Sequence, residues 1–187
     1  VGMAKIAVNN YTNNPAAYFK HLSRLRLDSL SGIDLVGERR PQITRPGDQL
    51  WGPTTLPWMA FGYNIAIAPI QTLAVYNMVA NNGVMMRPYL VNRIQEEGRV
   101  IKSIDPKVYN PQVYSPATIK AAKIALEGVC INGTGKSLFK NSPYKVAGKT
   151  GTAVVANGNK GYADKIYQSS FAGYFPAENP QYTIVVI

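Results

Sequence analysis

The stretch Val146-Ala147-Gly148-Lys149-Thr150-Gly151-Thr152 lies inside an extended run over residues 144–155 and decides the interpretation of the chain. Side chains alternate along a strand, so Lys149 and Gly151 are expected on one face and Thr150 and Thr152 on the other, unless the strand twists at the glycine. A glycine within a strand lets a second backbone approach closely. The stretch predicts a sheet edge that accepts an extended peptide, with hydroxyls and an ammonium nearby to hold a carboxylate. The simpler alternative is an exposed edge strand guarded by a lysine.

Two more extended runs follow this one, over Gln168 to Phe175 and Gln181 to Ile187. The turn-forming residues Pro176-Ala177-Glu178-Asn179-Pro180 join them. Strands with short connections become antiparallel neighbours. Residues 144–187 are therefore predicted to form antiparallel strands, in which the run that carries Lys149 is an edge.

Residues 1–143 have mainly the signals of helices and loops. A first helix is expected to carry Met3, Ile6 and Ala7 on one face. Asn14-Pro15 begins a second helix, which carries Tyr18, Leu22 and Leu25 on its apolar face and ends near Leu27. A helix is also predicted from Pro69 to about Asn82, where Asn81-Asn82-Gly83 ends it. The last predicted helix begins at Ser115 and Pro116. Its inner face is expected to carry Ile119, Ala122, Leu126 and Val129, and Gly133-Thr134-Gly135 ends or bends it. Helices followed by antiparallel strands predict an α+β fold.

The connections between these helices are also predicted. Ser29 to Gly52 is rich in glycine and proline and predicts a long irregular excursion, with Trp51 and Trp58 pinning its far end to the core. Residues 84–95 and 99–104 flank Glu96-Glu97-Gly98 as two extended runs, so a small hairpin is expected.

Composition limits the classes of partner. The formal net charge of +10 favours an acidic partner, but Arg39-Arg40 is the only adjacent basic pair, which argues against a nucleic-acid module. No apolar run approaches the roughly 20 residues of a membrane span. Cys130, the only cysteine, is expected to be a small buried residue, and His21 has no second histidine or cysteine cluster beside it. We expect no metal and no cofactor.

Two short patterns imitate catalytic motifs. Gly135-Lys136-Ser137 and Gly148-Lys149-Thr150 end like phosphate-binding loops, but Cys130 and Pro143 stand where the first glycine of such a loop is required. Ser137-Leu138-Phe139-Lys140 has the spacing of a serine nucleophile and its lysine base. It lies only nine residues before Lys149, too close to fold against it around a substrate, so we interpret it as chance.

Residues 146–152 resemble the third signature of the serine penicillin-binding proteins and serine β-lactamases. Further segments resemble monofunctional class B transpeptidases in the same order, over essentially the whole chain. They are Thr44 to Leu50, Phe61-Gly62-Tyr63-Asn64, Pro69 to Leu73, Ala80 to Gly83, Leu126 to Val129, Gly133 to Lys136 and Ser170 to Pro176. Within that family the chain looks most like the cell-division, or septal, transpeptidase.

The resemblance implies a penicillin-binding protein and serine β-lactamase-like fold, an antiparallel sheet with covering helices, incomplete here. Residues 1–187 would be the C-terminal part of one transpeptidase domain, with 1–143 mainly helices and loops and 144–187 strands. The activity implied is peptidoglycan cross-linking by serine acyl transfer from D-Ala-D-Ala stem peptides, which β-lactams inhibit. The implied location is the extracytoplasmic face of the bacterial inner membrane, with an anchor outside this chain and other cell-division or cell-wall synthesis proteins as partners.

The same resemblance assigns roles at the third signature. Lys149 would bring positive charge to the substrate carboxylate and to a proton network, and would count with Thr152 among the catalytic residues. Thr150 and Thr152 would hydrogen-bond the carboxylate beside Gly151, and the Thr152 backbone N–H would form half of an oxyanion hole. The serine-any-any-lysine nucleophile signature and the serine-any-asparagine signature are not identified in this chain, and both are expected before Val1.

The same fold also serves other functions. A β-lactamase or D,D-carboxypeptidase of the same fold would need a deacylating base, and Glu38 is the only glutamate of the long excursion. A β-lactam-sensing receptor would share the fold and the acylation step.

Overall fold

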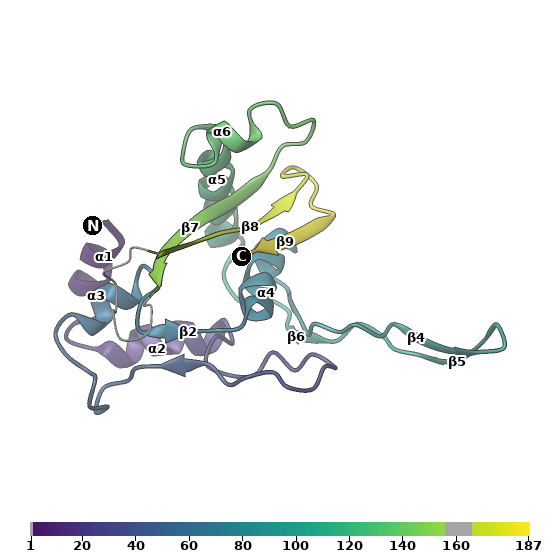
Figure 1. Cartoon of the computed structure of the whole chain (residues 1–187), viewed down its shortest axis with the longest axis horizontal. Coiled ribbons are helices and arrows are strands. Elements are labelled where there is room, and N and C mark those ends of the chain that lie inside the picture. The colour runs from purple at the N-terminus through teal and green to yellow at the C-terminus, as the bar shows by residue number, and fades with distance from the viewer. Residues whose placement is uncertain (1, 156–165) are drawn as a thin grey trace. The chain divides into compact units, whose positions relative to one another are not determined.

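The computed structural model of the chain describes residues 2–155 and 166–187 (Figure 1). The backbone forms two compact units: unit 1 is Val1–Gln71 with Pro88–Ile104, and unit 2 is Thr72–Arg87 with Asp105–Ile187. Helices and antiparallel sheets occur together, which confirms the α+β prediction. The elements in chain order are α1 (Gly2–Tyr11), α2 (Pro15–Arg24), β1 (Gln42–Ile43), α3 (Thr55–Met59), β2 (Ile65–Ala66), α4 (Pro69–Ala80), β3 (Met85–Met86), β4 (Arg93–Glu96), β5 (Arg99–Ser103), β6 (Val108–Asn110), α5 (Pro116–Ile131), α6 (Lys136–Phe139), β7 (Ala147–Val155), β8 (Ile166–Phe175) and β9 (Tyr182–Val186).

Unit 1 is built around a small core of Phe19, Leu22 and Met59. Phe19 was not among the predicted inner-face residues of α2, yet it is buried, and Trp51 packs against its ring. The prediction that tryptophans pin the excursion to the core is therefore confirmed for Trp51. It is wrong for Trp58, which is 49% exposed and packs edge-on against Tyr63.

The two N-terminal helices differ in detail from the prediction. In α1 only Ala7 is buried, whereas Met3 and Ile6 are exposed, so the predicted apolar face is wrong for these two residues. Helix α2 ends at Arg24 and not near Leu27. Arg26 takes a φ of 54°, and the Leu27 N–H donates to the Leu22 carbonyl over 2.9 Å. This closure by a left-handed residue is a Schellman motif, formed here without the usual glycine.

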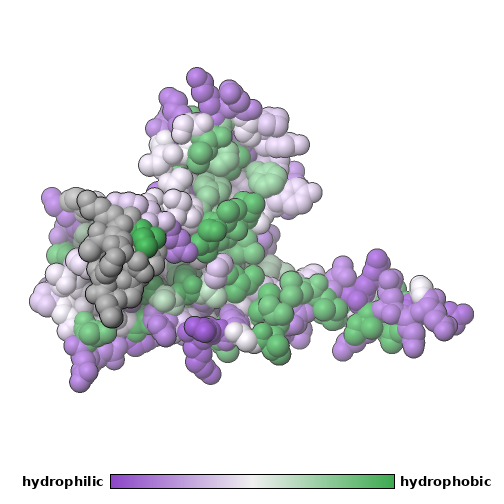
Figure 2. All heavy atoms as spheres, in the orientation of Figure 1, coloured by the Kyte–Doolittle hydropathy of each residue, from purple (hydrophilic) through white to green (hydrophobic). Residues whose placement is uncertain are grey.

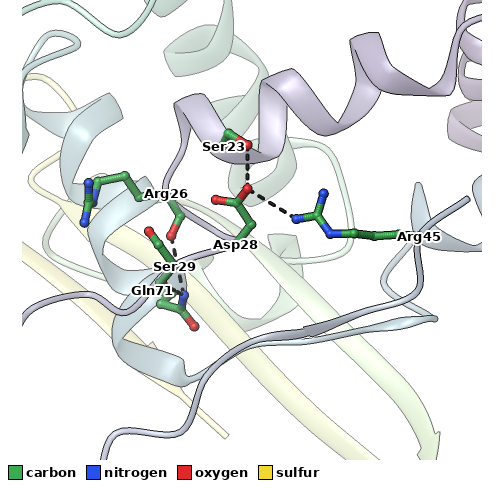
Figure 3. A network of polar contacts seen from close by, with 6 residues as sticks. All are labelled: Ser23, Arg26, Asp28, Ser29, Arg45 and Gln71. Atoms are coloured by element: carbon green, nitrogen blue, oxygen red, sulfur yellow. Dashed lines mark hydrogen bonds and ion pairs between the residues drawn. The ribbon is translucent and has the colours of Figure 1, made fainter. Parts of the chain in front are cut away.

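A polar network holds the start of the long excursion against the start of α4 (Figure 3). Gln71 is 2% exposed, and its Nε2 donates to the Ser29 carbonyl over 2.6 Å and toward the Arg26 carbonyl over 3.4 Å. Its Oε1 accepts from the Ala68 N–H. Nearby, Asp28 accepts from Ser23 and pairs with Arg45 over 3.4 Å. The buried amide thus satisfies backbone groups that an irregular segment leaves unpaired.

The rest of the excursion carries little regular structure, as predicted. Its one strand, β1, pairs antiparallel with β2 over two residues. The hairpin is confirmed as β4 paired with β5, and every residue of both strands is exposed. Figure 2 shows hydrophilic residues gathered toward the turn of this hairpin. The single run predicted over residues 84–95 is wrong, because β3 pairs with β6 instead of continuing into β4, and Pro88, which lacks an N–H, lies between them.

Unit 2 contains α5, α6 and most of α4. Ser115 caps α5 by accepting a hydrogen bond from the Thr118 N–H, as predicted from its sequence. The Lys123 ammonium of α5 donates to the Ala80 carbonyl over 3.1 Å and to Asn82 Oδ1 over 2.7 Å, at the C-terminal end of α4. Burial lowers the pKa of Lys123. A cation at the end of α4 complements the helix dipole there.

Strands β7, β8 and β9 form one antiparallel sheet in that order, which confirms the predicted pairing and places β7 at an edge. The register is continuous from Ala147 opposite Tyr174 to Val155 opposite Ile166. Helix α5 packs against β7. Ala147, Ala172 and Tyr174 are buried, so this part of the sheet lies within the core of unit 2.

Candidate active site

The candidate site is built on β7, and its first determinant is the glycine at position 148. A Cβ at Gly148 would lie 2.6 Å from the Ala172 carbonyl oxygen and 2.9 Å from the Gly173 Cα, and would also collide with the Phe171 ring. Gly148 of β7 lies directly opposite Gly173 of β8 in the antiparallel pairing. The Phe171 ring therefore lies where side chains would otherwise stand, and it meets Phe139 of α6 at 5.1 Å between ring centroids. An aromatic ring over paired glycines holds this section of the two strands together.

Lys149 and Thr150 begin a short chain of polar contacts. The Lys149 Nζ donates to the Thr150 carbonyl over 2.7 Å and to the Thr150 Oγ1 over 3.3 Å. The Thr150 Oγ1 also lies 2.7 Å from the Thr134 Oγ1, with either hydroxyl able to donate. Lys149 is exposed and Thr150 is partly buried. The ammonium is thus held beside a hydroxyl pair and stays accessible to solvent.

Thr134 is the member of this chain of contacts that the sequence prediction missed. It lies in the Gly133-Thr134-Gly135 segment, which was interpreted as the end of a helix and as part of the resemblance to class B transpeptidases, with no role assigned to Thr134. The Gly135 N–H donates to the Val129 carbonyl over 3.0 Å, so the chain turns back toward α5 there. Only the packing of α5 against β7 brings residue 134 to residue 150. A threonine between two glycines was the available signal, and it is a weak one.

Gly151 and Thr152 continue the strand toward its outer end. Gly151 lies opposite Ser170 and Thr152 opposite Ser169. A Cβ at Gly151 would collide with the Ser170 hydroxyl, so the glycine leaves room for that side chain. Thr152 is exposed. Both strands therefore carry hydroxyl side chains at positions that follow Lys149 along β7.

Behind the strand, α5 supplies a buried thiol and a carboxylate. Burial raises the pKa of the Cys130 thiol, a hydrogen bond with the Gly148 backbone acts in the opposite sense, and Glu127 raises the pKa further. The prediction that Cys130 is a small buried residue is confirmed. Burial, with smaller contributions from Glu127 and Cys130, raises the pKa of Tyr174 to about 12.

The arrangement is chemically suited to an anion that approaches the edge strand. One ammonium and several hydroxyls are suited to a carboxylate, since a charge-assisted hydrogen bond is about twice as strong as a neutral one. The edge strand offers backbone groups to an extended peptide. Lys149, Thr150, Gly151 and Thr152 are brought together by their own strand, with Thr134 added from the turn between α5 and α6.

Neither serine-to-lysine spacing near this strand forms a nucleophile and base pair. Ser137 lies in α6 and Lys140 directly after it, and no hydrogen bond joins them. The same spacing occurs from Ser142 to Lys145. The Ser142 Oγ donates to the Tyr144 carbonyl over 2.8 Å, so this hydroxyl stabilises the approach to β7.

Glu38, the glutamate considered as a deacylating base, lies in unit 1. Its Oε1 accepts a hydrogen bond from the Ser31 N–H over 2.8 Å. The contact closes a loop of the excursion on itself.

Within residues 2–155 and 166–187, no three His, Cys, Asp or Glu side chains are grouped so that they could hold a metal ion. No helix in the same residues combines the length and the apolar character needed to cross a membrane.

Comparison with known proteins gives a family match over the full chain. The family described as penicillin binding protein transpeptidase domain matches residues 1–187. The chain is 32% identical to the stage V sporulation protein D of Bacillus subtilis over 170 residues, covering 90% of this chain and 26% of that protein. It is 27% identical to the peptidoglycan D,D-transpeptidase FtsI of Escherichia coli, covering all of this chain and 29% of that protein. The chain thus spans under a third of the length of these relatives.

Solved structures agree with the fold. Penicillin-binding protein 2B of Streptococcus pneumoniae superposes with a TM-score of 0.83 at 20% identity, over 98% of this chain and 33% of that one. Penicillin-binding protein 3 of Mycobacterium tuberculosis, solved in complex with aztreonam, superposes with a TM-score of 0.76 at 25% identity, over 99% of this chain and 42% of that one.

Proposed function

Because the chain belongs to the family of penicillin-binding protein transpeptidase domains, as its sequence indicated, we propose that it forms the carboxylate-binding side of a D,D-transpeptidase site. The observation that carries the proposal is the contact chain from Lys149 through Thr150 to Thr134 on an exposed edge strand. The protein that contains it cross-links peptidoglycan by acyl transfer from D-Ala-D-Ala stem peptides and is acylated by β-lactams.

In this proposal the donor peptide lies along β7 as an additional strand. Lys149 attracts the terminal carboxylate of the peptide and contributes positive charge to the proton network of the site. The hydroxyls of Thr150 and Thr152 donate hydrogen bonds to the same carboxylate. Thr134 orients the Thr150 hydroxyl, since the two oxygens lie 2.7 Å apart. The Thr152 N–H stabilises the oxyanion of the tetrahedral intermediate, a contribution worth about 3 to 4 kcal/mol for one donor in hydrolases.

The nucleophile comes from another part of the protein. Neither Ser137 nor Ser142 is placed as one, and the chain carries no serine-any-asparagine motif. The chain by itself should therefore not be labelled covalently by a fluorescent penicillin, whereas the complete protein should be labelled at one serine. Rapid labelling of the isolated chain would contradict this division of roles.

The roles on β7 are tested by acylation kinetics of the complete protein with a fluorescent penicillin. Thr150→Val removes a hydrogen bond to a charged group and should slow acylation on the order of tenfold to a hundredfold, from about 1.5 to 3 kcal/mol. Lys149→Ala should slow it further, because it removes a charge and a member of the proton network. Lys107→Ala, an exposed lysine that precedes β6, is the control and should leave the rate unchanged. A Lys149→Ala protein acylated at the parent rate would mean that the site is wrongly assigned.

The surroundings follow from the same assignment. We place the protein at the extracytoplasmic face of the inner membrane, anchored by a segment outside this chain. Other cell-division and cell-wall synthesis proteins are its partners. Fractionation of cells that express the tagged complete protein tests the location, and recovery of the tag in the soluble cytoplasmic fraction would contradict it.

A further inference from the structure

A cavity of about 340 Å³ lies in unit 2, apart from the residues assigned to substrate. It is bounded by the C-terminal end of α5, by α6 and by the segment that leads into β7. Its volume falls at the lower end of the range of small-molecule sites. Neither Lys149 nor the threonines of the candidate active site line it.

The wall of the cavity is largely apolar. Ile131, Phe139 and Val146 line it, together with the buried thiol of Cys130. These surfaces favour an apolar ligand body, because burying them removes hydrocarbon from water. The aromatic ring of Phe139 is already fixed by its contact with Phe171.

The cavity is also bordered by more positive charge than negative. Among the described residues, Lys136, Lys140 and Lys145 line it, against one carboxylate from Glu127. Lys136 and Lys140 are four residues apart, at the start of α6 and just past its end, so they lie on the same side of it. In the part of the chain that the structure describes, none of the three ammoniums makes a hydrogen bond or an ion pair. Figure 2 shows hydrophilic residues over α6, with apolar residues below them.

From this pairing of an apolar wall with three unpaired ammoniums, we propose that the cavity binds a small apolar carboxylate, with its hydrocarbon body against Phe139 and Val146 and its head group at the lysines. Glu127 repels the head group from its own side, which orients the ligand. No arginine is among the described residues that line the cavity, so the planar fork that suits bidentate phosphate recognition is missing from that lining. This site does not depend on the proposed transpeptidase function.

The test is calorimetric titration of the complete protein with octanoate and, separately, with 1-octanol. Octanoate should bind at millimolar concentrations or below. The double variant Lys136→Gln/Lys140→Gln should weaken octanoate binding about fivefold or more and leave octanol binding unchanged, since only the carboxylate uses the lysines. The matched control Lys102→Gln/Lys107→Gln removes the same charge from residues outside the cavity and should change octanoate binding less than twofold, about the level of a bulk charge effect.

A second measurement places the ligand in the cavity and separates it from the active site. Octanoate should slow alkylation of Cys130 by iodoacetamide, followed by mass spectrometry of the peptide that contains it, because the thiol lines the same cavity. Lys149→Gln should leave octanoate binding unchanged. Absence of octanoate binding, equal loss in both double variants, no protection of Cys130, or loss of binding with Lys149→Gln would each overturn the proposal.

Discussion

The β7–β8–β9 sheet and the β4–β5 hairpin are both antiparallel and were both predicted from extended runs around a turn, yet they are stabilised very differently. In the sheet, α5 packs against β7 and the Phe171 ring covers paired glycines. In the hairpin every residue is exposed, and its register shifts between Ile94 and Gln95. An isolated pair of strands is only marginally stable in water. Strand pairing alone therefore does not determine which sheet is rigid enough to carry a site.

The largest expected difference between the two regions comes from glycine substitutions. Gly148→Ala should destabilise unit 2 by about 3 kcal/mol, because the new Cβ collides with the backbone of β8. Gly98→Ala in the hairpin turn meets nothing within 4 Å and has only the strain of its φ of 78° to bear, about 1 kcal/mol. Denaturant unfolding of both variants measures the difference. Equal destabilisation would show that the close approach of β7 and β8 is not what holds the sheet.

Next in size is the pH dependence that Tyr174 gives the sheet. Its side chain is 0% exposed, its hydroxyl has no hydrogen-bond partner among the described residues, and its pKa is raised to about 12. Below pH 10 the phenol is protonated in both folded and unfolded states. Between about pH 10 and pH 12 only the unfolded state loses the proton, so stability should fall by about 2 to 3 kcal/mol.

Tyr174→Phe isolates this contribution. The variant should lose that part of the alkaline decline, and at pH 7 it should be at least as stable as the parent, because it removes an unpaired buried hydroxyl. Unfolding free energies measured from pH 7 to pH 12 provide the comparison. A variant with an unchanged alkaline slope would mean that the phenol ionises as easily in the folded sheet as in the unfolded chain.

The smallest expected effects come from placing a threonine hydroxyl at a buried and at an exposed valine, one beside the sheet and one in the hairpin. Val146→Thr places a hydroxyl at a residue 9% exposed, just before β7, and should cost about 1 to 2 kcal/mol. Val100→Thr makes the same change at a residue 51% exposed in β5 and should cost less than about 0.5 kcal/mol. Thermal unfolding of the two variants tests this. If Val100→Thr lowered the stability more than Val146→Thr did, the side chain of Val100 would be buried in solution and the comparison would fail.

Local chemistry allowed several features to be predicted from sequence. Ser115 caps α5 because its side chain accepts a hydrogen bond from a free backbone N–H of the first turn, and the proline after it favours the first helical position. Neither effect needs a contact with a distant part of the chain. The end of α2 was placed too late, because Arg26 adopts a left-handed φ that its residue type does not favour. The pairing of β3 with β6 was missed, because it joins Met85 to Asn110 and Met86 to Val108, which are far apart in the sequence.

At the candidate site, the strand, its edge position and the order of Lys149, Thr150, Gly151 and Thr152 could be predicted from local patterns, because alternation and short turns are local properties of the chain. Tertiary structure alone decided that Thr134 meets Thr150, that the Phe171 ring lies against Gly148, and that three lysines border one apolar cavity. Each of these contacts joins residues from separate elements. Their distance in space is set by how α5 and α6 pack on β7, which no pattern within a single segment encodes.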